Sequence, residues 1–389
     1  MKKICIVTSS RADYGILRPL ILKICQEKYF KLKLVATGMH LCPEFGNTYL
    51  EIEKDGINIH RKINIQLSSD ETSAMSKTMG LTLICFADYF AEHIPDLLIL
   101  LGDRYEIAAV AAVAANQRIP IAHLHGGETT EGAIDEFYRH AITKMSALHF
   151  VSCEEYRKRI IQLGEQPDRV FNVGALGVEN ILKMSLITTE ELSSKLDFEL
   201  SPKKYCVVTF HPTTLDSTST QQQLSELMDA MDAFSDMHFL ITKANSDAEG
   251  RAINNLWEKY VAERRNCLLV SSLGVRQYLS ALKNTAAVIG NSSSGILEAP
   301  ALNVPTINIG DRQKGRLCAD SIIHCAPFKS EIVKAIKKAL SDNFIAICEA
   351  TKNPYGDGNT SQKIIMILKE SLESGLSVAK SFYDIGFEV

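Results

Sequence analysis

Residues 96–106 have the sequence DLLILLGDRYE, and this stretch indicates the fold more clearly than any other. Asp96–Leu101 contains a continuous apolar run, which is typical of a strand buried on both faces. Gly102, Asp103 and Arg104 follow directly, where a helix is expected to begin. In sheets of this kind, ligands bind beyond the carboxyl ends of the strands. Asp103 and Arg104 therefore form either a functional pair, moving a proton and clamping a phosphate, or a structural ion pair at a helix start.

Short apolar runs alternate with amphipathic, helix-like stretches on both sides of this segment. The pattern restarts after Lys195–Lys204, a polar stretch that contains Pro202 and is a candidate domain edge. Such alternation predicts two doubly wound α/β domains with parallel sheets, each about half of the chain. The further strand candidates are Lys3–Thr8, Leu32–Thr37, Ile57–Ile65, Ile119–His123, Ala147–Val151 and Val170–Val173, then Tyr205–Phe210, His238–Thr242, Cys267–Val270, Ala286–Gly290 and Pro305–Ile309.

The composition is that of an ordinary globular protein. The 389 residues include 42 Lys+Arg and 46 Asp+Glu, and 46% are hydrophobic. A length of this size predicts about two domains. The net charge of −4 leaves no broad basic surface, so we expect no nucleic-acid partner.

The ten cysteines are scattered and form no CxxC pair, which disfavours a zinc ribbon or a thioredoxin-type centre. Several lie in apolar runs, where a reduced, buried thiol is expected. The N-terminal apolar run is too short for a signal peptide, and no stretch reaches the roughly 18 apolar residues of a membrane span. We expect a soluble, cytoplasmic protein without a membrane partner.

Three further motifs follow strand candidates and carry side chains suited to chemistry. The first is His123-Leu-His125-Gly-Gly-Glu128, followed by Asp135 and Glu136. Two histidines and several acids suggest a metal site, but a third ligand at fixed spacing is missing, so we expect no metal. Glu128 and Asp135 would instead serve acid–base chemistry, with the glycine pair allowing close approach to a ligand. The alternative is a solvated loop beside a satisfied core histidine.

The other two motifs point to an anion. Ser9 and Ser10 precede Arg11 at a predicted helix start, which is either an anion site or an ordinary capped helix. In the second half, Gly290-Asn-Ser292-Ser293-Ser-Gly joins a strand to a helix and has the form of a phosphate cradle, without the lysine of a P-loop. The alternative is a plain helix cap.

Three side chains near the cradle complete the second-half candidates. His211 lies at another strand exit and is held extended by the following proline. Glu298 lies one turn into the helix, where it would accept ribose hydroxyls. Arg312 follows the next strand and adds a cation beside the phosphates.

Together these motifs resemble the hydrolysing UDP-N-acetylglucosamine 2-epimerases of sialic acid biosynthesis. The resemblance runs nearly from end to end, and the order and spacing of the motifs are more specific than any one of them. It rests on SRADYG, TGMH, FGNTY, LGDRYE, HLHGGE, DEFYRHAITK, FHPTT, GNSSSGILE and INIGDRQKGR.

The resemblance implies two Rossmann-like domains of the glycosyltransferase-B kind, with UDP in the cleft between them and no redox cofactor. It implies an N-terminal domain of residues 1–178 plus about 369–389, and a C-terminal, UDP-binding domain of residues 179–368. A homo-oligomer, dimer or tetramer, is the only protein partner implied.

Site residues carry over from the resemblance in two groups. The catalytic group would be Asp103, Glu128 and Asp135, with Glu136 in reserve. Many relatives have an acid where this chain has His125, so either His125 or Glu128 takes over that proton transfer. The UDP-binding group would be Arg11, Arg104, His211, Asn245, Ser292, Ser293, Glu298 and Arg312.

The reaction implied is elimination of UDP to give 2-acetamidoglucal, followed by hydration to N-acetylmannosamine. A non-hydrolysing epimerase, a glycosyltransferase and a UDP-sugar sensor remain alternatives, although a sensor has no need of Asp103 and Asp135. A further alternative is the related enzyme of legionaminic acid synthesis, whose substrate carries an acetamido group at C4 of the sugar.

Overall fold

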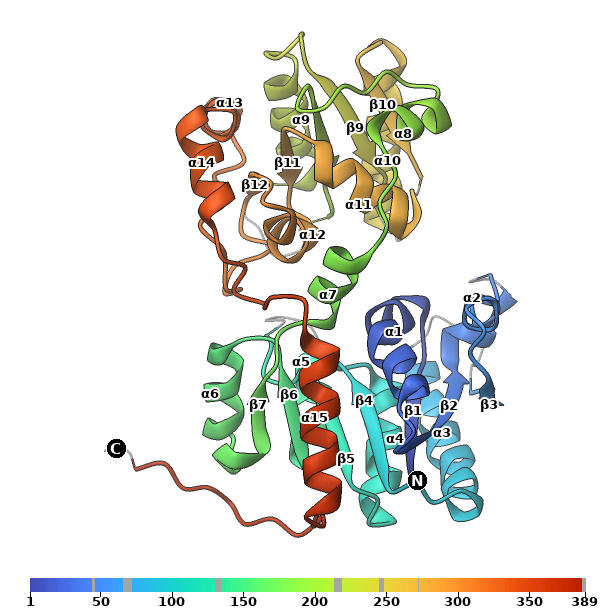
Figure 1. The fold of residues 1–389 in the computed structure, drawn as a ribbon. Helices are drawn as coiled ribbons and strands as arrows, with labels where there is room; N and C mark the ends of the chain where they lie inside the picture. Colours follow the sequence, from blue (N-terminus) through green and yellow to red (C-terminus); the bar gives the residue numbers. More distant parts are fainter. Residues whose placement is uncertain are drawn as a thin grey trace. The chain divides into compact units, whose positions relative to one another are not determined.

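The computed structural model describes residues 1–43, 46–65, 72–129, 134–212, 219–244, 248–271 and 273–386. The chain divides into two compact units. Unit 1 comprises Met1–Asn180 and Tyr355–Val389, and unit 2 comprises Ile181–Pro354. Each unit has a parallel sheet with helices on both faces, which confirms the predicted pair of doubly wound domains (Figure 1).

Unit 1 is built on a seven-stranded sheet with the order β3-β2-β1-β4-β5-β6-β7. All its pairings are parallel, and the strand order reverses beside β1, where β4 pairs with it. In doubly wound folds this reversal marks the ligand-binding edge. The strands are β1 (Lys2–Thr8), β2 (Phe30–Thr37), β3 (Ile59–Ile63), β4 (Leu97–Leu101), β5 (Ile121–Leu124), β6 (Leu148–Val151) and β7 (Val170–Asn172).

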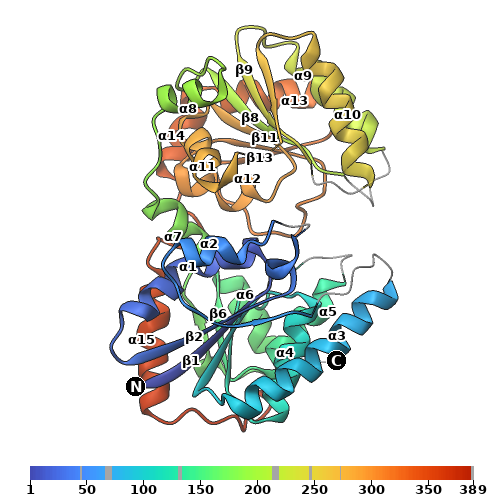
Figure 2. The ribbon, with the colours of Figure 1, turned by 90° about the vertical axis from the view of Figure 1, so that its right-hand side faces the viewer.

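The buried strand β4 shows why helices must pack on both faces of this sheet. All five of its side chains are buried. Leu97, Ile99 and Leu101 belong to a core shared with α1 and α15, whereas Leu98 and Leu100 belong to a core shared with α3 and α4. Side chains alternate along a strand, so a continuous apolar run supplies both cores. Figure 2 shows α1 and α15 on one side of this sheet and α3 and α4 on the other.

The helices of unit 1 follow its strands in alternation. The helix α7 begins in unit 1 and crosses the boundary into unit 2, and α15 returns to pack against α1. The helices of unit 1 are α1 (Arg11–Gln26), η1 (Gly38–Leu41), α2 (Tyr49–Lys54), α3 (Thr72–Glu92), α4 (Tyr105–Asn116), α5 (Asp135–Met145), α6 (Glu154–Gln162), η3 (Pro167–Arg169), α7 (Leu176–Lys183) and α15 (Thr360–Glu373).

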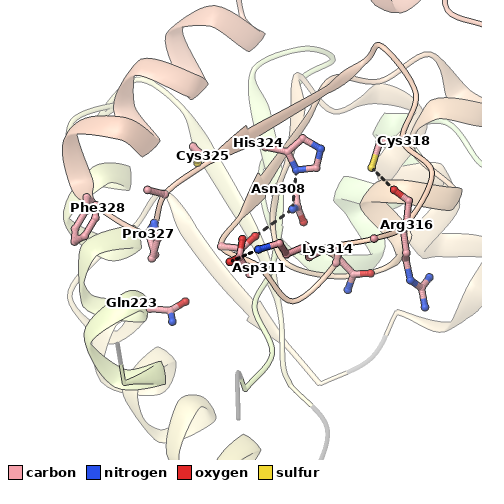
Figure 3. Close-up of a pocket in the computed structure, with 14 residues that line it drawn as sticks. Gln223, Asn308, Asp311, Lys314, Arg316, Cys318, His324, Cys325, Pro327 and Phe328 are labelled. Carbon is pink, nitrogen blue, oxygen red and sulfur yellow. Dashed lines mark hydrogen bonds and ion pairs between the residues drawn. The ribbon is translucent and has the colours of Figure 1, made fainter. Parts of the chain in front are cut away.

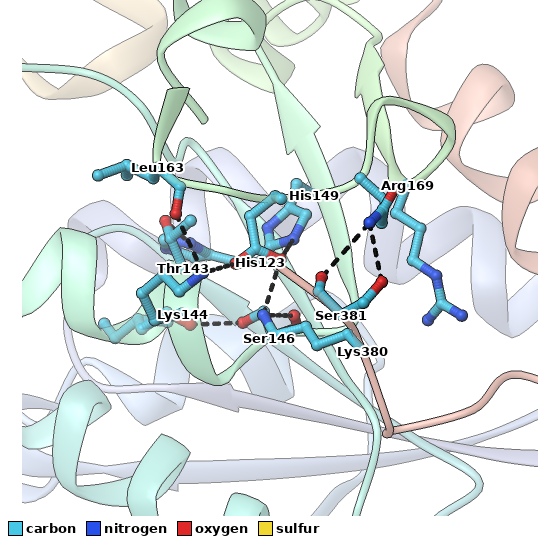
Figure 4. A network of polar contacts seen from close by, with 12 residues as sticks. His123, Thr143, Lys144, Ser146, His149, Leu163, Arg169, Lys380 and Ser381 are labelled. Carbon is cyan, nitrogen blue, oxygen red and sulfur yellow. Dashed lines mark hydrogen bonds and ion pairs between the residues drawn. The ribbon is translucent and has the colours of Figure 1, made fainter. Parts of the chain in front are cut away.

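The C-terminal return is longer than the segment expected from about Lys369. That residue lies inside α15, and Tyr355 already belongs to unit 1. Beyond α15, the Lys380 ammonium donates to the buried carboxylate of Glu165 at 2.7 Å and to the carbonyl of Ser146 at 2.9 Å (Figure 4). The tail is thus fastened to the β6–β7 side of unit 1.

Unit 2 has a six-stranded sheet with the order β10-β9-β8-β11-β12-β13. Its helices α9 and α13 pack on one face, and α8 and α11 on the other. The strands are β8 (Tyr205–Thr209), β9 (His238–Thr242), β10 (Cys267–Val270), β11 (Ala287–Gly290), β12 (Thr306–Ile309) and β13 (Ile322–Cys325). The helices are α8 (Thr189–Leu196), α9 (Thr220–Met231), α10 (Ala248–Ala262), α11 (Gly274–Asn284), α12 (Ser294–Leu297), η4 (Pro300–Leu302), α13 (Lys329–Ala339) and α14 (Asp342–Ala350).

The structure adds one strand that the sequence did not predict. β13 is only four residues long, IIHC, and just one of its side chains, that of Ile323, is buried. A short edge strand has no continuous apolar run, so pattern alone does not reveal it. All ten cysteines are free thiols. Among the described residues, no helix is both long and apolar enough to cross a membrane.

Candidate functional site

The acidic cluster of unit 1 gathers at the carboxyl edge of the sheet around one buried arginine. Arg139, on α5, is only 4% exposed. Its guanidinium donates to the Asp103 carboxylate, to Glu136 Oε2 at 2.9 Å and to the backbone carbonyl of Glu128 at 2.8 Å. One cation therefore ties the exit of β4, the loop after β5 and the start of α5 together. The sequence analysis did not assign Arg139 a role.

Asp103 has an environment that favours its protonated form. Burial raises the pKa of Asp103, the Arg139 guanidinium opposes that rise, and the nearby carboxylates of Asp135 and Glu128 add to it. These influences show that three of the four predicted catalytic residues face a common region. A carboxyl group with a raised pKa binds a proton more tightly than an ordinary carboxyl group, which suits it to act as a base.

The fourth predicted catalytic residue, His125, is bonded to Glu128. Its backbone is left-handed, with φ of 63°. The ring Nδ1 lies 2.8 Å from Glu128 Oε1, and the Ser152 hydroxyl donates to the same oxygen at 3.3 Å. His125 Nε2 is buried and has no hydrogen-bond partner among the described residues. The His125 ring and the Glu128 carboxylate are therefore in direct hydrogen-bonding contact.

His123 is a satisfied core histidine with partners of its own. Its Nδ1 lies 3.1 Å from the Thr143 hydroxyl, and its Nε2 lies 2.8 Å from the Gly102 carbonyl. Burial lowers its pKa to about 3, so the ring is neutral. Within the described parts of the chain, no three His, Cys, Asp or Glu side chains come together as a metal site.

The glycine pair after His125 is explained by packing within unit 1. A Cβ on Gly127 would lie 2.5 Å from the carbonyl of Tyr156, and a Cβ on Gly126 would lie 3.0 Å from the Ile160 side chain. Gly127 also has φ of 76°, which favours glycine. Close packing against α6 therefore accounts for both glycines, and the approach of a ligand to them stays a prediction.

The Asp-Arg sequence at the end of β4 does not form an ion pair. Arg104 Nε donates instead to Glu106 Oε1 at 2.5 Å, and Glu106 is only 2% exposed. The reason is geometric, because α4 begins at Tyr105 and its first turn presents Glu106 to the arginine. Arg11 lies at the start of α1, is half exposed and comes within 4.0 Å of Glu51.

Two residues that follow β1 and β2, Asp13 and His40, belong to this part of the site and were not predicted. Asp13 accepts a hydrogen bond from the Ser9 hydroxyl at 2.9 Å; burial raises its pKa, and Arg104 opposes the rise. His40 lies between the hydroxyls of Thr8 and Thr48, at 3.0 and 2.8 Å, and burial lowers its pKa to about 4. Both lie inside quoted motifs, SRADYG and TGMH, so their positions were the available signal.

In unit 2, Asn291 gathers the predicted anion-binding residues. Its side chain exchanges two hydrogen bonds with the backbone of His211, at 2.7 and 2.9 Å. Its carbonyl accepts from Arg312 Nη1 at 3.0 Å and from Gln313 Nε2 at 2.8 Å. The exits of β8, β11 and β12 are thereby held together. Sequence reasoning placed His211 and Arg312 near this turn but did not single out Asn291.

The serine turn that follows β11 is tightly built. A Cβ on Gly290 would lie 1.9 Å from the Thr209 carbonyl, so only glycine permits this approach to β8. The Ser292 hydroxyl accepts from the amide of Ser294 at 3.3 Å. Ser293 is the N-cap residue of α12 and forms no side-chain capping bond. The Ser293 hydroxyl is therefore not used to cap the helix.

Glu298 lies at the other end of α12, in a small hydrogen-bonded group. It accepts from the Ser294 hydroxyl at 2.5 Å, and the Tyr278 hydroxyl donates to Ser294 at 2.7 Å. Burial raises the pKa of Glu298. The remaining predicted nucleotide residue, Asn245, lies outside the described residues.

Chemically, the two units differ. Unit 1 offers carboxylates of raised basicity, a histidine–carboxylate pair and three arginines, which suits proton transfer beside a negative charge. Unit 2 offers hydroxyls, a short helix start and an arginine, which suits phosphate groups.

Comparisons with known proteins show which family the chain resembles. A sequence profile of the UDP-N-acetylglucosamine 2-epimerase family matches residues 23–369. Polysialic acid biosynthesis protein P7 of Escherichia coli is 42% identical over 386 residues, covering 99% of this chain and 98% of that protein. The GDP/UDP-N,N'-diacetylbacillosamine 2-epimerase (hydrolyzing) of Campylobacter jejuni is 41% identical over 385 residues, covering 99% of both.

A solved structure extends the comparison to the fold. UDP-GlcNAc 2-epimerase from Neisseria meningitidis, bound to UDP-GlcNAc, superposes with a TM-score of 0.76 at 16% identity, covering 95% of this chain and 100% of that one. The likeness confirms two Rossmann-like domains of the glycosyltransferase-B kind.

Proposed function

Because the chain belongs to the UDP-N-acetylglucosamine 2-epimerase family, as its motifs suggested, we propose that it is the hydrolysing enzyme, converting UDP-GlcNAc and water to ManNAc and UDP. The observation that carries the proposal is the cluster around Arg139, which joins the Asp103 carboxylate to the backbone of Glu128, the side-chain partner of His125. Such a cluster has no purpose in a protein that only binds a nucleotide sugar.

The first step is an elimination. A carboxylate of unit 1 takes the proton from C2 of the sugar, the electron pair forms a C1–C2 double bond, and the C1–O bond breaks to release UDP. We assign the base to the Arg139-linked cluster, with Asp103 as its leading member, because its environment raises its basicity. The product of this step is 2-acetamidoglucal.

The second step is hydration of that glycal. Water adds its oxygen to C1 and loses a proton to a base, while an acid delivers a proton to C2 from the opposite face. Two protonation sites are therefore needed, and the pair of His125 and Glu128 supplies the second. The sum is UDP-GlcNAc plus water giving ManNAc plus UDP.

The departing diphosphate needs stabilisation, since the C2 proton is not acidic in the free sugar. We assign the phosphates to Ser292 and Ser293 with Arg312, and the ribose to Glu298. Arg11 and Arg104 would act on the leaving group from unit 1. Preorganised donors of this kind contribute strongly when charge develops on a leaving group.

Isotope labelling tests the reaction class directly. In heavy-oxygen water, the label is expected at C1 of free ManNAc and absent from UDP, because the C1–O bond is the one that breaks. In deuterated water, deuterium is expected at C2. Label in UDP would show attack at phosphorus, and release of UDP-ManNAc would identify a non-hydrolysing epimerase; either result refutes the proposal.

A second substrate is favoured by one specific observation. The 41%-identical Campylobacter jejuni relative is named for N,N'-diacetylbacillosamine, a sugar with acetamido groups at both C2 and C4. The same elimination and hydration would convert UDP-N,N'-diacetylbacillosamine to UDP and the 2-epimer of that sugar. The two candidates differ on the C4 side of the ring, away from the reacting atoms.

A further inference from the structure

The backbone just before Asp103 is held by the neighbouring strand, β5. Gly102 has φ of 77°, so the chain turns sharply where it leaves β4. The Gly102 amide donates to the Leu124 carbonyl at 3.0 Å, and the Gly102 carbonyl lies 2.8 Å from His123 Nε2. That carbonyl shares one planar peptide unit with the Asp103 amide. His123 therefore fixes the peptide from which the Asp103 side chain departs.

The ring of His123 also reaches α5, the helix that carries Arg139. Its Nδ1 lies 3.1 Å from the Thr143 hydroxyl (Figure 4). His123 and Thr143 are both fully buried, and a Cβ on Gly126 would lie 3.0 Å from each of the two bonded atoms. Thr143 follows Arg139 by four residues, which places both on the same face of α5. The ring is thus a bridge between the exit of β4 and the face of α5 that presents Arg139.

The chemistry of the partners sets the direction of both hydrogen bonds. Burial lowers the pKa of His123 to about 3, so the ring is neutral near pH 7 and carries one N–H. The Gly102 carbonyl can only accept, so that hydrogen is on Nε2. Nδ1 is then an acceptor, and the Thr143 hydroxyl is its donor. Because the ring does not titrate near neutral pH, the bridge keeps one arrangement there.

We propose that His123 and Thr143 are positioning residues for the proton transfer at C2, because together they hold Asp103 against Arg139. The inference rests on the proposed function and adds two residues to it that act through Asp103 rather than on the sugar. Asp103 comes from β4 and Arg139 from α5, and their side chains form an ion pair. The bridge joins the same two elements beside this pair, so it sets how closely the carboxylate and the guanidinium meet.

The closeness of Arg139 also controls the basicity of Asp103. Burial raises the pKa of Asp103, and the carboxylates of Asp135 on α5 and Glu128 after β5 add to the rise. The Arg139 guanidinium is the group that opposes it. If the bridge were broken, α5 would be held less firmly at this point and the opposition would weaken. The pKa of Asp103 should then rise further.

The titration of Asp103 tests the bridge without reference to turnover. With aspartate isotope-labelled at its carboxyl carbon, NMR follows the Asp103 signal against pH, and the signal is assigned by its absence from Asp103→Asn. Thr143→Val keeps the shape of the side chain and removes the hydroxyl donor, so the pKa of Asp103 should rise by about 0.5–1. Thr143→Ser keeps the hydroxyl and should retain the native value. Thr82→Val is the control, because Thr82 is another fully buried helical threonine, whose hydroxyl donates to the Thr78 carbonyl at 2.7 Å.

His123→Leu provides a second variant, which removes both contacts of the ring with a side chain of similar bulk. It should raise the pKa of Asp103 in the same direction. His324→Leu is its control, because that histidine also lies on a strand and bonds a neighbouring side chain, with Nδ1 3.1 Å from Asn308 Nδ2. His324 lines a cavity of about 650 Å³ in unit 2 and has no contact with α5 or β4 (Figure 3). The pKa of Asp103 should be unchanged in this control.

Turnover supplies a second readout. Thr143→Val should lower kcat for UDP release about ten-fold, because a small displacement of a catalytic group from the reacting atoms is costly. Calorimetric UDP affinity should stay within about two-fold, since UDP is assigned to unit 2. Thr82→Val should keep both values.

The two readouts separate the inference from the proposed function. An unchanged Asp103 titration in both Thr143→Val and His123→Leu would overturn the inference, and so would an equal rise in Thr143→Ser or in the two controls. If the unaltered chain released UDP from neither UDP-GlcNAc nor UDP-N,N'-diacetylbacillosamine, the proposed function would fail. The titration would still decide whether the bridge positions Asp103.

Discussion

Replacing Asp103 by asparagine separates catalysis from stability more sharply than any other change in unit 1. The substitution keeps the size of the side chain and an acceptor oxygen for Arg139, but removes the basic group. Loss of a general base typically lowers the rate by about 10²–10⁴-fold. At about 1.4 kcal/mol per factor of ten, that is roughly 3–5.5 kcal/mol of transition-state stabilisation.

The same substitution should raise the free energy of unfolding although it lowers the rate. Burial and two neighbouring carboxylates raise the pKa of Asp103, so the folded state holds this proton more tightly than the unfolded state. The group's favourable contribution is complete below its unfolded pKa and is lost as pH rises through its folded pKa. At pH 7 the ionised form therefore opposes folding. Asp103→Asn should therefore increase the free energy of unfolding at pH 7.

The assay combines UDP release, calorimetric UDP binding and denaturant unfolding at pH 7. Asp96→Asn is the matched control, because Asp96 precedes the same strand and accepts from the Lys3 amide at 2.6 Å. We expect that control to keep its turnover. If Asp103→Asn lost UDP affinity as far as activity, Asp103 would be a binding residue. If it lost stability instead, the reasoning from its environment would be wrong.

Three further predictions concern other parts of the chain. Ser292→Ala with Ser293→Ala should weaken calorimetric UDP binding by about 1–3 kcal/mol, through lost phosphate hydrogen bonds; unchanged affinity would make the turn a helix cap only. Gly290→Ala should prevent folding, because its Cβ would overlap a β8 carbonyl. Gly15→Ala lies inside α1, where the added Cβ meets no atom within 4 Å, so it should raise the melting temperature. Equal effects of the two substitutions on the melting temperature would contradict this reasoning. Burial raises the pKa of Glu165, but bonds from one histidine and two lysines outweigh it and lower the pKa to about 2. The stability advantage of the native protein over Glu165→Gln should therefore be complete above about pH 4.5 and vanish as pH falls toward 2; a constant difference would refute it.

The strand pattern was readable from sequence because burial on both faces demands continuous apolar runs. β4 is the clearest case, since its five apolar side chains divide between two cores. The exits of such strands, at Asp103, His125, His211 and the Gly290 turn, were therefore identifiable as candidate positions. β13 was not, because a short strand at the sheet edge needs no apolar run.

Which side chains meet was decided only by the tertiary structure. Asp103 is followed directly by an arginine, yet its partner is Arg139, 36 residues later in the sequence. Adjacent residues at a helix start point in different directions, so Arg104 reaches Glu106 instead. A parallel sheet, by contrast, brings the ends of distant strands to one edge. The sequence predicted which kinds of side chain lie at that edge. Which of them pair depended on the order of the strands and on the position of α5, which carries Arg139.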